Sequence, residues 1–148
     1  MRTFYQITDA PLDPEALRAA IADPASGAVA GFVGVTRNSF AGKPVRHLEY
    51  EAFVPLAEQE MARIGTEIAG LWPSVTGVAI AHRIGRVEVA EASVAIAITA
   101  PHRREALAAC AHAIERLKAT LPVWKKEVFA DGSEWRENRE EEELDGGR

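Results

Sequence analysis

Three lysines lie on either side of Pro122, and their spacing would let Lys118 form a functional pair with Lys125 or Lys126. Lys118 lies on the polar side of the last turn of a long predicted helix, and Lys125 and Lys126 follow Trp124 in the next segment. Because a proline stops the helix and lets the chain fold back, Lys118 can come near one of the other two. Two ammonium groups held close together lower each other's pKa towards the range used in catalysis. Such a pair can bind phosphate, move a proton or attack a carbonyl; the alternative is that Lys118 only complements the helix dipole at the surface.

Two further groups of basic residues are suited to binding an anion. The long helix opens with Pro101, His102, Arg103 and Arg104, where backbone N–H groups and basic side chains together attract negative charge. Arg37 follows a glycine-rich apolar segment at the mouth of a loop, and loops at strand ends often carry ligand contacts. The alternative for both groups is a solvated basic surface, although basic residues in a first helical turn oppose the helix dipole.

Other kinds of chemistry find less support in the sequence. His47, Glu49 and Glu51 alternate on one face of a predicted strand, a pattern more typical of a polar edge than of a metal site. Cys110 is the only cysteine, and its place on an apolar helical stripe indicates a small core residue rather than a nucleophile. The glycines match no phosphate-binding loop, and no segment matches a nucleic-acid-binding module.

The charge is unevenly distributed along the 148 residues, which carry 17 Lys and Arg against 22 Asp and Glu. Residues 137–148 form an acidic segment with six acids and two arginines, whereas residues 102–126 have an excess of basic side chains. We therefore expect one domain over residues 1–136, followed by an acidic, flexible tail over residues 137–148. A basic zone on a nearly neutral body indicates a small anionic ligand rather than a long polyanion. No apolar run is long enough to cross a bilayer and no signal peptide is evident, so we expect a cytoplasmic protein without a membrane partner.

The predicted elements place these residues at strand and helix ends. Hydrophobic periodicity predicts helices over residues 13–23, 55–71 and 101–121, with apolar stripes that include Leu71 and Leu107. Strands are predicted over residues 2–8, 27–36, 45–53, 75–82, 86–89, 92–99, 123–129 and 134–136, and residues 27–36 are expected to be buried. Because strands occur in runs, the order favours an α+β fold with a largely antiparallel sheet and three helices.

Taken together, these segments resemble the MoaE family, the large, catalytic subunit of molybdopterin synthase. The resemblance runs from about residue 27 to residue 136. It rests on the segments GFVGVTRN (31–38), LEYEAF (48–53), HRIG (82–85), EASV (91–94), PHR (101–103), Leu117-Lys118, PVWKKE (122–127), Asp131-Gly132 and Trp135.

The resemblance implies an α/β-hammerhead fold and a sulfurtransferase activity that needs no metal or organic cofactor. The implied reaction converts cyclic pyranopterin monophosphate into molybdopterin by installing two dithiolene sulfurs. The implied sulfur donor is the C-terminal thiocarboxylate of a small, ubiquitin-like partner subunit. Two copies of the large subunit would form a central homodimer with one small subunit at each end, a heterotetramer.

The resemblance also assigns roles to particular positions. The two essential lysines of the family fall on Lys118 and Lys125. The implied substrate contacts are Val35, Thr36, Arg37, His102, Arg103, Lys126 and Glu127, together with the two lysines, and Arg139 is a possible additional contact. This sequence departs from the family at Thr36, where valine is usual, and at Ser39-Phe40, where His-Asn is usual. An alternative is a non-catalytic module that binds a phosphorylated small molecule or a partner's C-terminal tail.

Overall fold

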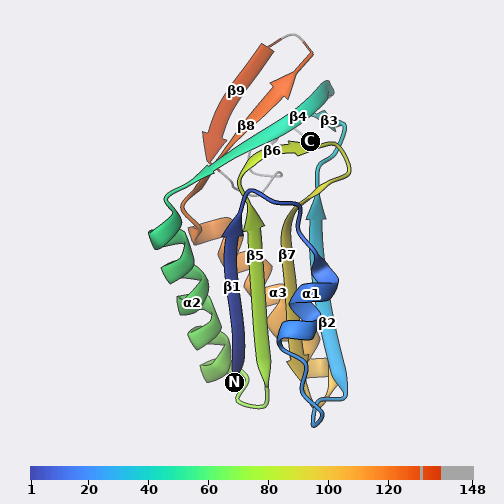
Figure 1. Cartoon of the computed structure of the whole chain (residues 1–148), viewed down its shortest axis with the longest axis vertical. Coiled ribbons are helices and arrows are strands. Elements are labelled where there is room, and N and C mark those ends of the chain that lie inside the picture. Colours follow the sequence, from blue (N-terminus) through green and yellow to red (C-terminus); the bar gives the residue numbers. More distant parts are fainter. Residues whose placement is uncertain (131, 138–148) are drawn as a thin grey trace.

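The computed structural model describes residues 1–130 and 132–137, which form two β-sheets and three helices (Figure 1). The helices are α1 (Pro14–Ala20), α2 (Val54–Leu71) and α3 (Arg103–Thr120). The strands are β1 (Arg2–Thr8), β2 (Ala28–Val35), β3 (Ser39–Phe40), β4 (Lys43–Ala52), β5 (Gly77–Arg83), β6 (Gly85–Glu88), β7 (Ala92–Ala100), β8 (Val123–Phe129) and β9 (Gly132–Glu137). The predicted acidic tail begins at the end of β9, and residues 138–148 lie outside the described part of the chain.

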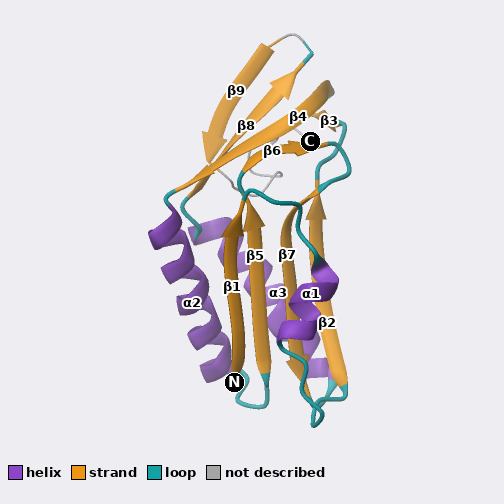
Figure 2. Cartoon of the chain, viewed as in Figure 1, coloured by secondary structure: helices purple, strands orange, loops and turns teal. Residues whose placement is uncertain are grey.

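The first sheet has the strand order β1-β5-β7-β2 and is covered by helices on both faces (Figure 2). Side chains alternate along β5, so that Val78 and Ile80 join the core beneath α2 and α3, whereas Ala79 and Ala81 pack with Leu17 of α1. Only the β1–β5 pair is parallel in this sheet, because β5–β7 and β7–β2 are antiparallel. The strand β7 is buried on both faces, and the predicted, largely antiparallel α+β fold is confirmed.

The prediction that residues 27–36 form a buried strand is wrong in its burial. These residues form β2, which is the last strand of its sheet and pairs only with β7 among the described strands. Val29, Val33 and Val35 are 49%, 42% and 55% exposed, because α1 packs against β1, β5 and β7 instead. The apolar composition of residues 27–36 therefore predicted a core strand, whereas the fold makes β2 an edge strand with exposed apolar side chains.

The second sheet crosses one end of the first, as the upper part of Figure 1 shows. Its strand order is β3-β4-β8-β9, and β6 also pairs with β4. The loop after β2 leads into the short β3, which the sequence did not predict. Because β4 and β8 are antiparallel with Tyr50 opposite Lys125, residues from both strands meet above the end of the first sheet.

Two apolar stripes hold α2 and α3 against the first sheet, although one leucine predicted for each stripe is exposed. In α2 the buried residues include Met61, Ile64 and Ile68, but Leu71 is 55% exposed. In α3 the buried stripe consists mainly of the small residues Ala106, Ala109, Cys110, Ala113 and, at its end, Leu117. Leu107 is 61% exposed, because the alanines let the helix lie close to the sheet and turn the leucine outward.

The first helix begins as predicted and ends earlier. Asp13 caps α1 by accepting hydrogen bonds from the backbone N–H groups of Glu15 and Ala16, and Pro14 occupies the first turn. The helix ends at Ala20 because Ile21 leaves helical geometry and is fully buried against the sheet. Within the described residues, no helix is long and apolar enough to span a membrane.

Candidate functional site

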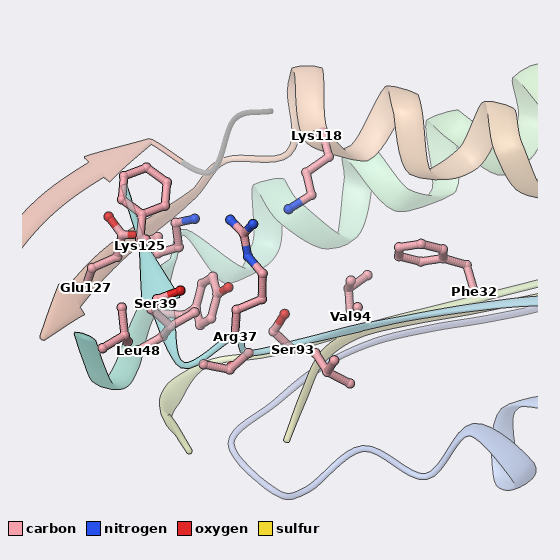
Figure 3. Close-up of a pocket in the computed structure, with 15 residues that line it drawn as sticks. Phe32, Arg37, Ser39, Leu48, Ser93, Val94, Lys118, Lys125 and Glu127 are labelled. Atoms are coloured by element: carbon pink, nitrogen blue, oxygen red, sulfur yellow. The ribbon is translucent and has the colours of Figure 1, made fainter. Parts of the chain in front are cut away.

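A pocket of about 150 Å³ lies where the loop after β2, the second sheet and the end of α3 meet (Figure 3). Its wall combines apolar side chains with a few charged and hydroxyl groups. The lining residues are Phe32, Gly34, Val35, Thr36, Arg37, Ser39, Phe40, Val45, Leu48, Tyr50, Ser93, Val94, Lys118, Lys125 and Glu127. An apolar wall with a few convergent polar groups is typical of a small-molecule site.

Lys118 reaches the pocket from the last turn of α3. Leu117 beside it is buried in the core, which fixes the rotation of the helix and directs Lys118 towards the second sheet. The backbone N–H of Leu121 bonds to the carbonyl of Leu117, and Pro122 then starts the turn into β8. The turn brings the next strand back past the helix end, as the sequence predicts.

Lys125 enters the pocket from β8, and strand alternation decides which of the two adjacent lysines does so. Lys125 and Glu127 point to the inner face and are 3% and 2% exposed. Lys126 points to the other face, where its Nζ lies 3.7 Å from Glu49. The Nζ of Lys125 also lies 5.9 Å from the centre of the Phe40 ring, within reach of a cation–π contact.

Arg37 completes a group of three cations in the pocket. In Figure 3 the Arg37 guanidinium extends towards the ends of Lys118 and Lys125, whereas Glu127 lies beyond Lys125. Three basic groups and one carboxylate give the described lining a net positive charge. A pocket of this composition favours an anionic ligand such as a phosphate or a carboxylate.

Thr36 contributes a hydroxyl group that the described part of the protein leaves without a hydrogen bond. Its backbone N–H donates to the carbonyl of Glu91, and its own carbonyl accepts from the N–H of Ala90, so the residue is held firmly. The side chain is 3% exposed and lines the pocket, yet Oγ1 has no hydrogen-bond partner among the described residues. A buried hydroxyl without a partner is costly, which is understandable where a ligand supplies the partner.

His82 lies behind Lys118, and the sequence gave no reason to pair the two. It is the last inward-facing residue of β5, is 2% exposed, and packs edge-on against the Tyr50 ring with 5.0 Å between ring centres. Burial lowers the pKa of His82 from its ordinary value to about 4, and the charge of Lys118 acts in the same direction. The period-2 alternation of residues 78–82 could have indicated the inward direction, but only the fold shows that α3 ends there.

Some of the implied substrate contacts lie away from this pocket. His102 and Arg103 are exposed at the opposite end of α3, and the sixteen residue steps from His102 to Lys118 correspond to about 24 Å along the helix. Lys126 points to the other face of β8, and Arg139 lies outside the described residues. Val35, Thr36, Arg37 and Glu127 all line the pocket.

The structure also bears on the metal site that the sequence disfavoured. His47 is buried, and its Nε2 lies 2.8 Å from a carboxylate oxygen of Glu49, so these two side chains pair with each other. Across the described ranges, no three His, Cys, Asp or Glu side chains lie close enough together to hold a metal ion. Cys110 is buried on α3, where burial raises the pKa of its thiol, as expected of a core residue.

The comparisons with known proteins agree on one family. The model of the family described as "MoaE protein" matches residues 7–120. A curated relative, the molybdopterin synthase catalytic subunit of Taeniopygia guttata, is 49% identical over 120 residues, which are 81% of this chain and 77% of the relative.

Solved structures give the same result at the level of the fold. Molybdopterin synthase from Staphylococcus aureus superposes with a TM-score of 0.85 at 41% identity, covering 88% of this chain and 94% of that one. A complex of subunits 1 and 2 of the molybdopterin-converting factor from Helicobacter pylori contains a chain that superposes with a TM-score of 0.73 at 21% identity, with 91% of each chain covered. At that identity the second likeness is one of fold.

Proposed function

The chain belongs to the MoaE family of molybdopterin synthase catalytic subunits, and we propose that its sulfur-transfer chemistry takes place in the pocket that holds Lys118 and Lys125. The family acts in molybdenum cofactor biosynthesis. The substrate is cyclic pyranopterin monophosphate, and the reaction installs the two dithiolene sulfurs of molybdopterin. The observation that carries the proposal is that two lysines from different elements, separated by Pro122 in the sequence, line one pocket together with Arg37.

The pocket's charges suit the phosphate and the polar atoms of the substrate. Arg37 can donate two parallel hydrogen bonds to a phosphate, which a lysine cannot do. Thr36 presents a buried hydroxyl, and Val35 adds apolar surface beside it. Glu127 lies beside Lys125 on the inner face of β8, where a carboxylate can hold a lysine in place or accept from the pterin. These four residues are proposed substrate contacts.

The two lysines have different surroundings, which supports different roles. Lys118 is only partly buried at the end of a helix, and we assign it the proton transfers that accompany sulfur attack and ring opening. Lys125 is buried between Phe40 and Glu127, where a fixed ammonium can hold the carbonyl of the donor tail or, as an amine, carry an acyl intermediate.

The sulfur donor in this proposal is a small, ubiquitin-like subunit with a C-terminal thiocarboxylate. The Helicobacter pylori chain with this fold was solved in a complex of subunits 1 and 2, which supports a partner of this kind. A second hollow, lined by residues 118–124, adjoins the end of α3 and includes Lys118. A tail that enters along it would bring its terminal carbonyl to the lysines.

A second copy of the chain explains the positions of His102 and Arg103. Because about 24 Å of helix separates them from Lys118, they cannot serve the same pocket within one copy. We propose a central homodimer, flanked by two small subunits in a heterotetramer, in which each copy lends these residues to the other's pocket. The exposed apolar edge strand β2, which leads directly to Arg37, supports a dimer surface next to the site. Lys126 and Arg139 remain proposed substrate contacts, although Lys126 points away from the pocket and Arg139 lies outside the described residues.

The experiment combines the purified chain with pyranopterin monophosphate and the thiocarboxylated small subunit. Product is measured as a dithiolene derivative, and binding of the small subunit is measured separately by calorimetry. Product from the native chain, with none from Lys118→Ala that still binds the small subunit, is the expected result. Tight binding of both ligands by a folded native chain that makes no product would instead support a non-catalytic binding module.

A further inference from the structure

The hydrogen bond made by Nδ1 of His82 fixes the tautomer of the ring. Its Nδ1 lies 2.8 Å from the carbonyl oxygen of Arg83. A carbonyl oxygen only accepts hydrogen bonds, so Nδ1 carries the hydrogen. Because burial holds the pKa of the ring near 4, the ring is neutral at physiological pH, and Nε2 carries a lone pair instead of a proton.

The surroundings of His82 direct this acceptor towards the end of α3. Val78, Ile80 and His82 share the face of β5 that packs beneath the two long helices. The Tyr50 ring meets the imidazole edge-on on one side. His82 and Lys118 also line the same small cavity, together with Val94, Ile114, Leu117 and Leu121.

The size of this cavity decides what can lie between the two side chains. Its volume is about 10 Å³, at the lower limit of what a single water molecule needs, and most of its wall is apolar. A water molecule would find few polar partners there. The small, mostly apolar cavity therefore favours a direct contact between the imidazole and the Lys118 side chain.

We propose that His82 is a positioning residue for Lys118, with its Nε2 accepting a hydrogen bond from the lysine and aiming the side chain at the reaction pocket. The proposal rests on the assignment of Lys118 to the reaction. It explains why a polar ring is buried at the one point of β5 that faces a proposed catalytic group. His82 does not store the proton itself, because a base with a pKa near 4 cannot hold one at neutral pH.

Two substitutions separate positioning from a purely structural role. The amide nitrogen of asparagine in His82→Asn can take the place of Nδ1 and keep the bond to the Arg83 carbonyl, but no group remains at Nε2. The longer glutamine in His82→Gln can place an acceptor at Nε2 but gives up the bond to Arg83. If His82 positions Lys118, His82→Gln keeps more activity although His82→Asn keeps more stability.

The measurements are kcat, KM for the pyranopterin, affinity for the small subunit, and the thermal midpoint. We expect kcat of His82→Asn to fall roughly tenfold or more, which corresponds to the loss of one hydrogen bond to a charged group, with KM within about twofold of native. We expect His82→Gln to stay within about threefold of native kcat. In a protein that already carries Lys118→Ala, His82→Asn should cause no further decrease in kcat.

The opposite ranking overturns the proposal. If His82→Asn keeps native kcat, or if activity simply follows the thermal midpoints of the variants, then His82 is only a core residue. Should His82→Asn fail to fold, His82→Leu replaces it as the variant without an acceptor, and the same comparison with His82→Gln applies. If Lys118→Ala itself keeps native activity, the assignment of Lys118 to the reaction fails, and that outcome is distinct from a failure at His82 alone.

Discussion

At the scale of single residues, several polar and charged groups are buried in or beside the pocket. Lys125 and Glu127 are almost fully buried charges, His82 is a buried imidazole, and Thr36 has a hydroxyl without a partner among the described residues. Each costs free energy relative to an apolar side chain of similar size. Polar groups buried at such a cost around one pocket indicate that the pocket is built for a ligand.

Thr36→Val tests this trade between stability and binding. Valine has the same shape without the hydroxyl, so we expect the free energy of unfolding of the unliganded protein to rise by about 1 kcal/mol. The KM for the pyranopterin should rise severalfold, because the ligand loses a hydrogen-bond partner. Denaturant unfolding and steady-state kinetics measure the two effects. A variant that is less stable, or one with unchanged KM, would show that the hydroxyl does not serve the substrate.

We expect the free energy of unfolding to fall at acidic pH because of His82. Its native pKa is about 4, below the ordinary value of 6.5, so between these two values the unfolded chain binds a proton that the folded chain does not. The contribution of His82 to the free energy of unfolding is therefore fully present above pH 6.5. It decreases by roughly 3 kcal/mol in total as the pH falls from 6.5 to 4. Urea unfolding of the native chain and of His82→Gln at pH 7.5 and pH 4.5 gives the difference. An equal loss in both proteins would contradict the assignment.

At the scale of elements, the site depends on how closely the helices approach the first sheet. Alanines on α3 let the helix lie low enough for Leu117 to enter the core and for Lys118 to reach the second sheet. On the other face, Gly77 of β5 allows the end of α1 to approach: a Cβ there would lie 2.5 Å from Thr99 Oγ1 and 2.8 Å from Ile21 Cβ. Small residues thus set the layer spacing that places the pocket.

Gly77→Ala should destabilise the protein, whereas Gly70→Ala should not. The first substitution forces a methyl group against Ile21 and Thr99, at an expected cost of about 1–3 kcal/mol. The second is on an exposed part of α2 with no atom within 4 Å of the added Cβ, and alanine should stabilise the helix by about 0.5–1 kcal/mol. Thermal unfolding of the two variants compares them. Equal thermal midpoints would mean that α1 can move away from β5 without cost.

The elements were largely predictable from the sequence, but the burial of several side chains was not. Periodicity and prolines placed α2, α3 and β8 within a few residues of their observed bounds. The apolar run of β2 was wrongly expected to be buried, since composition does not show which strand lies at an edge. Leu71 and Leu107 were assigned to buried stripes because they fit the spacing, yet alanines occupy the contact in α3. The local sequence pattern predicts whether a segment is a helix or a strand, whereas the packing of neighbouring elements decides which of its faces is buried.

The candidate site was partly predictable for the same reason. Lys118, Lys125 and Arg37 could be singled out because their types and positions at element ends suit an anionic ligand. Spacing alone left Lys125 and Lys126 as alternatives, the family resemblance pointed to Lys125, and in the structure Lys125 is the one that lines the pocket. His82 of β5 lies near Lys118 at the end of α3, although the two are far apart in the sequence. No local sequence pattern could have predicted this contact.

At the scale of the whole molecule, one copy of the chain holds only part of the proposed site. His102 and Arg103 lie at one end of α3 and the lysine pair at the other. The open apolar edge of β2 lies beside the loop that carries Arg37. The proposed homodimer would cover this edge and bring residues of the two copies together, so we expect the pocket and the assembly to depend on each other.

Mixed dimers test whether the two copies share the site. We expect Lys118→Ala and Arg103→Ala homodimers each to be nearly inactive. In a dimer with one variant of each kind, the pocket of the Arg103→Ala copy has an intact Lys118 and receives an intact Arg103 from the other copy. Random mixing in equal amounts should therefore restore about a quarter of native turnover, since half the dimers have one working site of two. No restoration after verified subunit exchange would place both residues in the same copy's site.

The most direct test of the central claim is single-turnover formation of the dithiolene by lysine variants in the complete complex. Lys118→Ala and Lys125→Ala are compared with Lys43→Ala, whose lysine packs against Phe129 outside the pocket. We predict that each pocket variant loses at least about a hundredfold in rate while it still binds the small subunit, and that the control stays within about twofold of native. Near-native rates in both pocket variants would contradict the assignment of the chemistry to this lysine pair.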